Sequence, residues 1–435
     1  MWSTDRSGTG SKAEGRPRVM DSWLGKLAYI GGAAAIMYSC WLYYAHYWGT
    51  YQNFNRSIEF CDLIYCDFTL FYYEQAKVIL RSHAPIPMYF YSPTFALLLE
   101  PLAHLPLPTA LVVWGWVQGL SLLLMVVSGV SLLRPFPWWT HATFLLMTLT
   151  SYPILHNWKW GQTSTVAVAL AMTSLALSDR TPAPLRTLPL ALATAIRYYP
   201  AIYGLVLIRA KRWGAFGWFV ILSLALLFVL PAVLMGPDAT LGFYEASSVA
   251  SKNAVGGWLE QGYPGSQYMA NVLGRVGSSW GLNTPEARQA LVVAGYVIVI
   301  LNLYVGVVRS SYSRQTQAPW IICFVGGCTP LMLPTSWMHY FCYLPFAQTF
   351  LLSQLAHSEL SAASRSLLLL VVWVPSAALS SVFFFNEVGP HEYYSRSGFL
   401  FFSNALMLAL AHGLAWHSRR TAVPSFASLQ PQGTT

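Results

Sequence analysis

Apolar runs of about 20 residues recur along nearly the whole chain, and each could cross a hydrocarbon core of about 30 Å as a helix. Charged residues make up only 9% of the 435 residues, against about 25% in a typical soluble domain. A segment surrounded by lipid must satisfy its own backbone hydrogen bonds, which favours helices. The sequence therefore predicts an all-α polytopic membrane protein.

Candidate membrane spans follow one another along the sequence. They are 27–48, 108–133, 138–156, 163–178, 213–235, 289–309, 318–334, 341–356, 366–385 and 398–416. The segment 185–208 is a separate case, because basic residues flank both of its ends and Pro200 disfavours a continuous helix. We expect this segment to enter and leave on one side as two half-helices, which brings the total to about twelve crossings.

Basic residues between the apolar runs set the expected orientation. Short loops rich in Lys and Arg usually lie in the cytoplasm. The formal charge of +9 is concentrated in such loops, which argues against nucleic acid as a partner. The apolar run after Lys26 is longer than that of a cleavable signal. The predicted parts are a cytoplasmic tail 1–25, a single integral domain 26–417 and a cytoplasmic tail 418–435, with 49–107, 236–288 and 386–397 on the outer face of the plasma membrane.

The six cysteines lie mostly in or near apolar segments. Their spacing matches neither a zinc site nor a redox CxxC motif. Only Cys61 and Cys66 are placed so that they could form a disulfide, and the sequence leaves open whether they do.

A short outer segment gathers four charged residues in a chain that has few of them. On a helical projection Asp67, Glu74, Lys77 and Arg81 share one face, while aromatic and aliphatic residues fill the opposite face. Such a helix lies in the membrane interface and holds a carboxylate within reach of a lipid-borne group. The alternative is a solvated charged face, with Glu74 and Lys77 forming an i,i+3 pair.

Four stretches of this sequence together resemble the polyprenyl-phosphate-mannose-dependent mannosyltransferases of glycosyltransferase family 87. They are DFTLFYYEQAKVIL with FYSPTFALLLEPLAHLP, WGQTSTVAVAL, ATAIRYYPAIYGLVLIRAKRW and LPTSWMHYFCYLPF. Ser92, Arg197 and Met338 depart from the residues usual in the family, namely proline, lysine and an acidic residue. The resemblance implies a GT-C fold and transfer of a sugar, mannose in this family, from a lipid phosphate on the outer face to a lipid or glycan acceptor.

Sugar transfer from a polyprenyl phosphate needs a base for the incoming hydroxyl and donors for the leaving phosphate. The resemblance places Asp67 as the base, which a modest rise in its pKa would suit to neutral pH. Arg197, His339 and Lys159 are the candidate phosphate-binding residues. Arg197 lies among apolar residues, where an ionisable group usually has a function. Salt bridging or snorkelling of Arg197, and a hydrogen-bonded interfacial role for His339, are the alternatives.

Other polar and aromatic residues on the same face are candidate substrate contacts. They are Gln162, Gln267, Tyr72, Tyr91 and Trp337. Aromatic belts at the membrane interface are the alternative explanation for the tryptophans. The chain has no DxD pair of the kind that holds a metal for nucleotide-sugar donors, so we expect neither a metal nor a cofactor.

Two other classes of function remain open at this point. A secondary transporter of a small polar or anionic solute would also use broken helices with polar residues at depth. A noncatalytic scaffold would need no outer carboxylate. The order of the motifs favours a membrane glycosyltransferase that binds a polyprenyl-phosphate donor, an acceptor and membrane lipids.

Overall fold

The computed structural model describes residues 65–421, apart from 262, 310–311, 314 and 389–390. Helices make up most of this part of the chain, and its one β-type pairing is an isolated antiparallel bridge between Ser151 and Ser381. The all-α prediction is therefore confirmed. The predicted tail 1–25 and first span 27–48 lie outside the described residues.

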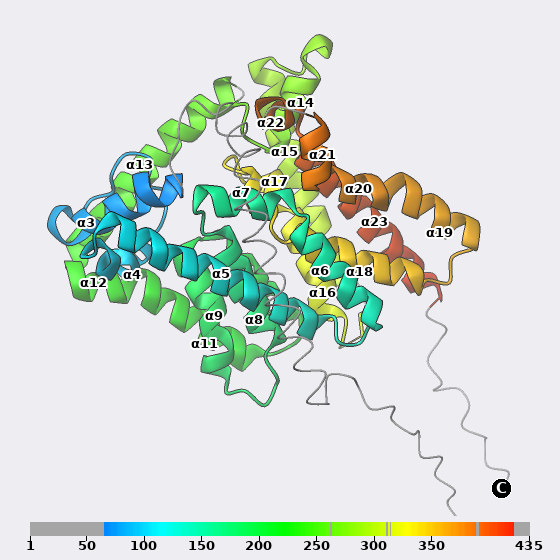
Figure 1. The fold of residues 1–435 in the computed structure, drawn as a ribbon, viewed down its shortest axis with the longest axis horizontal. Helices are drawn as coiled ribbons and strands as arrows, with labels where there is room; N and C mark the ends of the chain where they lie inside the picture. The colour runs from blue at the N-terminus through cyan, green and yellow to red at the C-terminus, as the bar shows by residue number, and fades with distance from the viewer. Residues whose placement is uncertain (1–64, 262, 310–311, 314, 389–390, 422–435) are drawn as a thin grey trace, which may run out of the picture.

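The helices pack as a bundle that spreads to both sides of α5 and α8 (Figure 1). In chain order they are α3 Tyr73–Ser82, α4 Pro93–Ala103, α5 Leu107–Leu132, α6 Trp138–Leu149, α7 Tyr152–Trp160, α8 Ser164–Ala176, α9 Ala183–Ile196, α10 Leu205–Arg209, α11 Trp213–Leu224, α12 Leu230–Met235, α13 Pro237–Gln261, α14 Met269–Val276, α15 Pro285–Leu303, α16 Gln317–Gly327, α17 Thr329–Met332, α18 Leu344–Ala356, α19 Ala362–Leu368, α20 Val374–Leu379, α21 Val382–Val388, α22 His391–Ser397 and α23 Phe399–Thr421. Short π-helical turns continue several of them, for example Ala225–Val229 between α11 and α12.

Five helical segments are long and apolar enough to cross a membrane. They are Leu107–Leu132, Trp213–Met235, Pro285–Val308, Ala362–Leu379 and Phe399–His417. Shorter apolar helices such as α8 and α9 pack among them. The structure thus shows a polytopic membrane protein, while the number of crossings, their orientation and the domain limits stay predictions.

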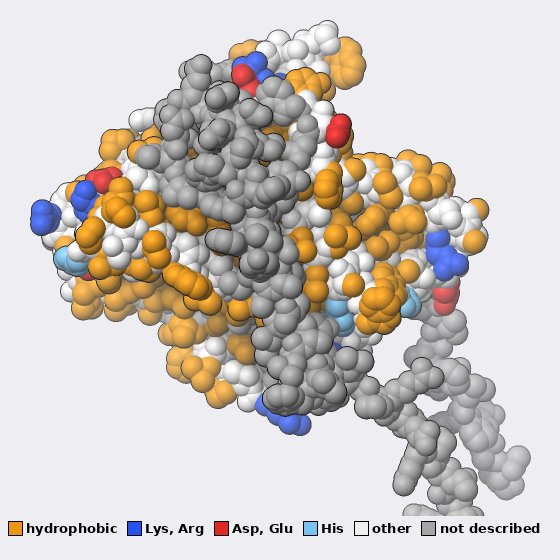
Figure 2. Space-filling view, in the orientation of Figure 1, with side chains coloured by type: hydrophobic (Ala, Val, Ile, Leu, Met, Phe, Trp, Pro, Cys, Tyr) orange, Lys and Arg blue, Asp and Glu red, His pale blue; other side chains and the backbone are white. Residues whose placement is uncertain are grey.

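The described surface matches a lipid environment. Hydrophobic side chains make up most of the described surface that is visible in Figure 2, and the charged side chains lie at the edges of the view. Large apolar side chains on α11 and α15 are more than half exposed, among them Trp213, Ile221 and Ile300. Exposed residues of this kind are favourable against acyl chains, which explains why these helices tolerate them.

The broken segment 185–208 has the predicted form. Helix α9 ends at Ile196, Arg197 adopts an extended conformation, and a 3₁₀ turn over Tyr199–Gly204 leads into α10. Asp179 lies before α9 and accepts hydrogen bonds from Arg186 at 2.8 Å and Arg212 at 2.6 Å. Because Arg186 opens the segment and Arg212 follows it, both ends lie on the same side.

The segment around Asp67, which was predicted to lie on the outer face, differs from its helical projection. Lys77 pairs with Glu74 at 3.0 Å on the exposed face, as expected. Asp67 does not share that face, since it is only 5% exposed. The reason is a π-helical turn over Phe68–Tyr72, which changes the angular spacing between Asp67 and α3. The single-face prediction was therefore wrong for Asp67.

Two hydrophobic clusters form the interior. The larger one joins α6, α8, α16, α18 and α23. The smaller one packs Phe68, Tyr72, Phe95 and Trp114 under the Asp67 turn, and Phe243 of α13 closes it. This smaller cluster supports the polar residues of the candidate site described below.

Candidate functional site

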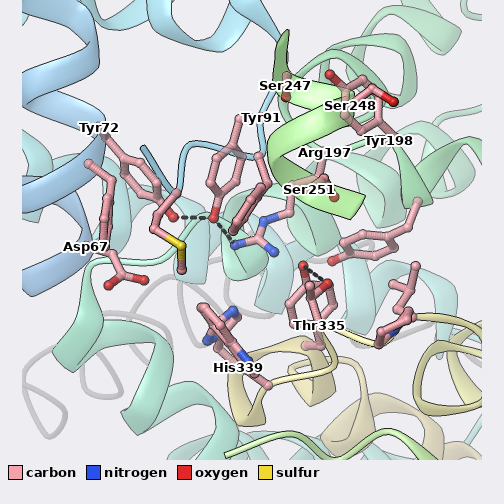
Figure 3. A pocket seen from close by; sticks show the side chains of 18 of the residues that line it. Asp67, Tyr72, Tyr91, Arg197, Tyr198, Ser247, Ser248, Ser251, Thr335 and His339 are labelled. Atoms are coloured by element: carbon pink, nitrogen blue, oxygen red, sulfur yellow. Dashed lines mark hydrogen bonds between the residues drawn. The ribbon is translucent and has the colours of Figure 1, made fainter. Parts of the chain in front are cut away.

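A cavity of about 550 Å³ opens between five segments that are far apart in the sequence (Figure 3). The turn after Asp67, the loop 88–91, the break at 197–199, helix α13 and the loop 333–340 each supply part of its wall. Aromatic side chains make up much of this wall, including Phe71, Tyr91 and Trp337. The cavity therefore combines a largely apolar lining with a few ionisable groups.

Arg197 is fixed at the break between the half-helices. Its guanidinium lies between the rings of Tyr91 and Tyr340, whose centroids are 4.9 and 4.7 Å from Cζ. Nε donates to Thr163 Oγ1 at 2.6 Å, and Nη2 donates to Tyr91 Oη at 2.7 Å and to Gln162 Oε1. No described residue accepts a hydrogen bond from Nη1, so this nitrogen is available to an anion in the cavity.

Gln162 occupies the centre of this network because of the glycine before it. Gly161 ends α7 with φ +64, and a Cβ there would lie 2.7 Å from Tyr65 Cβ, so only glycine fits. The turn allows Gln118 Nε2 to donate to the Gln162 carbonyl at 2.8 Å. Tyr72 Oη donates to Gln162 Oε1 at 2.8 Å. The amide of Gln162 thus links the Asp67 turn to Arg197.

Asp67 lies in the cavity wall with its carboxylate buried (Figure 3). No described residue donates a hydrogen bond to that carboxylate. Burial raises the pKa of Asp67 to about 7, and the positive charge of Arg197 limits the rise. Cys66, directly before it, is disulfide-bonded, whereas Cys323, Cys328 and Cys342 are free.

His339 faces Asp67 and Arg197 from the loop before α18 (Figure 3). It is 1% exposed, and neither ring nitrogen has a hydrogen-bond partner among the described residues. Burial lowers its pKa well below the usual value, and the charge of Arg197 adds to this, so the ring is neutral. A buried polar group without a partner costs about 1–3 kcal/mol, which a ligand in the cavity would relieve.

The other predicted site residues fall into two groups. Tyr72, Tyr91 and Trp337 line the cavity with Asp67, Arg197 and His339, and Gln162 lies directly behind them. Lys159 and Gln267 do not line the cavity. Lys159 is buried in the last turn of α7, near His156 and His391. Gln267 donates to the Ser395 carbonyl at 2.9 Å and accepts from the Phe401 amide, so backbone groups use its side chain.

Several lining residues were not predicted from the sequence. Ser247, Ser248 and Ser251 of α13 lie on one side of the cavity (Figure 3), and Lys252 of the same helix also lines it. Their segment is polar and reads as an outer loop, so nothing in the sequence marks it as a wall. Thr163, which accepts a hydrogen bond from Arg197 but does not line the cavity, was not predicted either, although it directly follows Gln162 and precedes a helix.

Comparison with known families shows which family the chain belongs to. Residues 89–336 match the family model for glycosyltransferase family 87, which is more than half of the chain. The chain belongs to this family. The resemblance noted in the sequence is thereby confirmed, and membership in glycosyltransferase family 87 identifies a membrane glycosyltransferase that uses a sugar donor and an acceptor. No curated protein and no solved structure matches the chain.

The family match covers one part of the site and leaves out another. Tyr91, Arg197 and the cavity-lining residues of α13 lie inside residues 89–336, whereas Asp67 and His339 lie outside it. The fold brings these two residues to the same cavity as the matched part. Within the described residues, no three His, Cys, Asp or Glu side chains are grouped as metal ligands.

Proposed function

We propose that the protein transfers mannose from a polyprenyl phosphate to a hydroxyl group of a lipid or glycan acceptor. One observation supports this most strongly: a buried carboxylate, a buried guanidinium with one unengaged nitrogen and a neutral imidazole line the same cavity. Base and anion-binding groups in one cavity are what this transfer requires.

In the proposed reaction the acceptor oxygen attacks the anomeric carbon of the sugar. Its proton passes to the Asp67 carboxylate, and the bond between the anomeric carbon and the phosphate oxygen breaks. The electron pair of that bond leaves with the polyprenyl phosphate. Arg197 Nη1 and one nitrogen of His339 donate hydrogen bonds to the phosphate and stabilise its developing charge. Atoms and charge balance without a further reactant.

The rigid setting of Arg197 supports its proposed role. The guanidinium is already held by cation–π contacts and hydrogen bonds, so it need not move when the phosphate leaves. A group fixed in this way stabilises the charge of the transition state effectively. Lys159 does not line the cavity. We therefore propose that it acts through its charge on His156 and His391 rather than through contact with the donor.

The apolar part of the wall suits the rest of the donor. Aromatic rings such as those of Tyr72, Tyr91 and Trp337 stack against sugar rings, and the apolar lining accepts the first isoprene units. Gln162 holds two of these rings in place through their hydroxyl groups.

We also propose that the cavity opens on the outer face of the plasma membrane. The disulfide at Cys66 supports this, because disulfides persist in oxidising compartments and are rare in the cytosol. Arg186, near the start of α9, and Arg212, just after α10, both pair with Asp179 at the helix ends that point away from the cavity. This placement is expected for cytoplasmic loops.

The test uses the full chain in lipid vesicles with radiolabelled mannosyl-phosphoryl-polyprenol and a lipid extract as acceptor. We expect label in an extractable lipid or glycan product, and Asp67→Asn should abolish it. Glu74→Gln is the matched control, because Glu74 is an exposed carboxylate seven residues away that pairs with Lys77. Accumulation of unmodified label inside the vesicles without product would indicate a transporter and overturn the proposal.

A further inference from the structure

A second cavity, of about 570 Å³, lies at the far ends of the helices that build the candidate site. Helix α8 runs from Ser164, beside Gln162, to Ala176 in the wall of this cavity, and α9 returns to Arg197. Thirteen or fourteen residues at 1.5 Å each separate the two cavities by about 20 Å. The second cavity is therefore not an extension of the first.

The lining of this cavity is positively charged. Arg134, Arg186 and Arg212 line it, and Asp179 is the single acidic residue among the described residues of its wall. Asp179 Oδ1 accepts from Arg186 at 2.8 Å and from Arg212 at 2.6 Å, so two guanidinium groups share one carboxylate. Among the described residues of the wall, three arginines therefore accompany one carboxylate.

Two residues that line this cavity carry buried donors without an acceptor among the described residues. Arg186 is 7% exposed, and its Nε has no hydrogen-bond partner in the described part of the chain. The same holds for Nε2 of Gln317, at the start of α16. Buried donors of this kind are normally satisfied, which points to a missing ligand with several acceptor atoms.

We propose that this cavity binds a phosphate group, carried either by the headgroup of an anionic lipid or by a water-soluble phosphate ester. Two N–H groups of one guanidinium can donate to two oxygens of the same phosphate, and three arginines line this cavity. Leu132, Leu175 and Val206 complete the wall and suit the glycerol and first acyl carbons of a lipid. The proposal is independent of the transfer reaction in the first cavity.

Arginines in short loops can serve only to set the orientation of a membrane protein, and such arginines do not need to line a cavity. Arg180 shows the contrast: it belongs to the same loop as Asp179 but is exposed and does not line the cavity. A purely topological role predicts that Arg134, Arg212 and Arg180 are interchangeable. A binding site predicts that only the first two matter for a phosphate ligand.

The experiment measures binding to the purified full chain in detergent micelles. The probes are dioleoyl-phosphatidylglycerol, with dioleoyl-phosphatidylcholine as the neutral control, and inorganic phosphate. Retained lipid is measured by native mass spectrometry and phosphate by calorimetry. The variants are Arg134→Gln with Arg212→Gln, and Arg180→Gln as the matched control. Arg134→Gln alone serves if the double variant does not fold, because Arg134 is exposed.

We expect the dissociation constant of a bound probe to rise at least tenfold in the double variant, at least threefold in Arg134→Gln, and not at all in Arg180→Gln. Tight binding of phosphatidylglycerol with weak binding of phosphate identifies a lipid headgroup, and the reverse identifies a soluble ester. If neither probe binds, or if the cavity variants bind as the wild type does, the proposal is wrong.

Discussion

The rate of sugar transfer should follow the ionisation of Asp67, because only the carboxylate form accepts the proton of the acceptor. Burial raises the pKa of this group from 3.8 to about 7. The ionised fraction is then about one tenth at pH 6 and about nine tenths at pH 8. We therefore expect kcat/KM to rise about tenfold between these values, whereas a carboxyl group that kept a pKa of 3.8 would give a flat profile.

Substitutions separate Asp67 from other groups that titrate near neutrality. Asp67→Asn should lower kcat/KM by about 10²-fold or more and remove the acidic limb of the profile. Glu74→Gln should leave both unchanged. Arg197→Gln should move the limb to higher pH, because Arg197 is the positive charge that holds the pKa of Asp67 down.

The assay is the initial rate of label transfer by the full chain in vesicles, at donor concentrations well below KM. A phosphodiester donor does not titrate in this range, so the profile reports the protein. A flat profile in the wild type, or an acidic limb that persists in Asp67→Asn, would refute the assignment. More than about a tenth of wild-type activity in Asp67→Asn would do the same.

Three further predictions concern the phosphate, the topology and metal ions. Arg197→Ala should raise KM for the lipid-linked donor or lower kcat, and Arg197→Lys should be milder because the charge is kept; unchanged donor kinetics in both would place the phosphate elsewhere. A cysteine at exposed Ser278 should react with an impermeant thiol reagent outside intact cells, and one at exposed Arg180 should not; the reverse labelling would invert the orientation. EDTA should leave transfer unchanged, since Arg197 already supplies a fixed positive charge; loss of activity that manganese restores would recast Asp67 as a metal ligand.

The parts of the fold that could be predicted depend on strong local signals. Apolar runs gave the all-α membrane class, and Pro200 with flanking arginines gave the break at Arg197. The burial of Asp67 could not be found in this way. A helical projection assumes 100° per residue, and the π-helical turn over Phe68–Tyr72 departs from that geometry.

The candidate site shows the same limit. Arg197 and Tyr91 belong to conspicuous motifs and indeed meet in the cavity. Gln267 is also a polar residue near an aromatic stretch, yet its amide forms hydrogen bonds with backbone groups of α22 and α23. Local sequence gives the polarity of a residue but not which wall it faces. The same reason explains why the serines of α13 were missed, since packing alone brings that helix to the cavity.

The setting of Arg197 also has a consequence for how the chain is made. Its partners Gln162 and Thr163 precede it and are already synthesised when it leaves the ribosome, but Tyr340 follows more than a hundred residues later. Helix α9 is about 21 Å long, too short to span a bilayer by itself. The half-helices therefore reach their final setting only after these later segments are made, and a nascent chain that stops before Tyr340 would lack one of the two rings that enclose the Arg197 guanidinium.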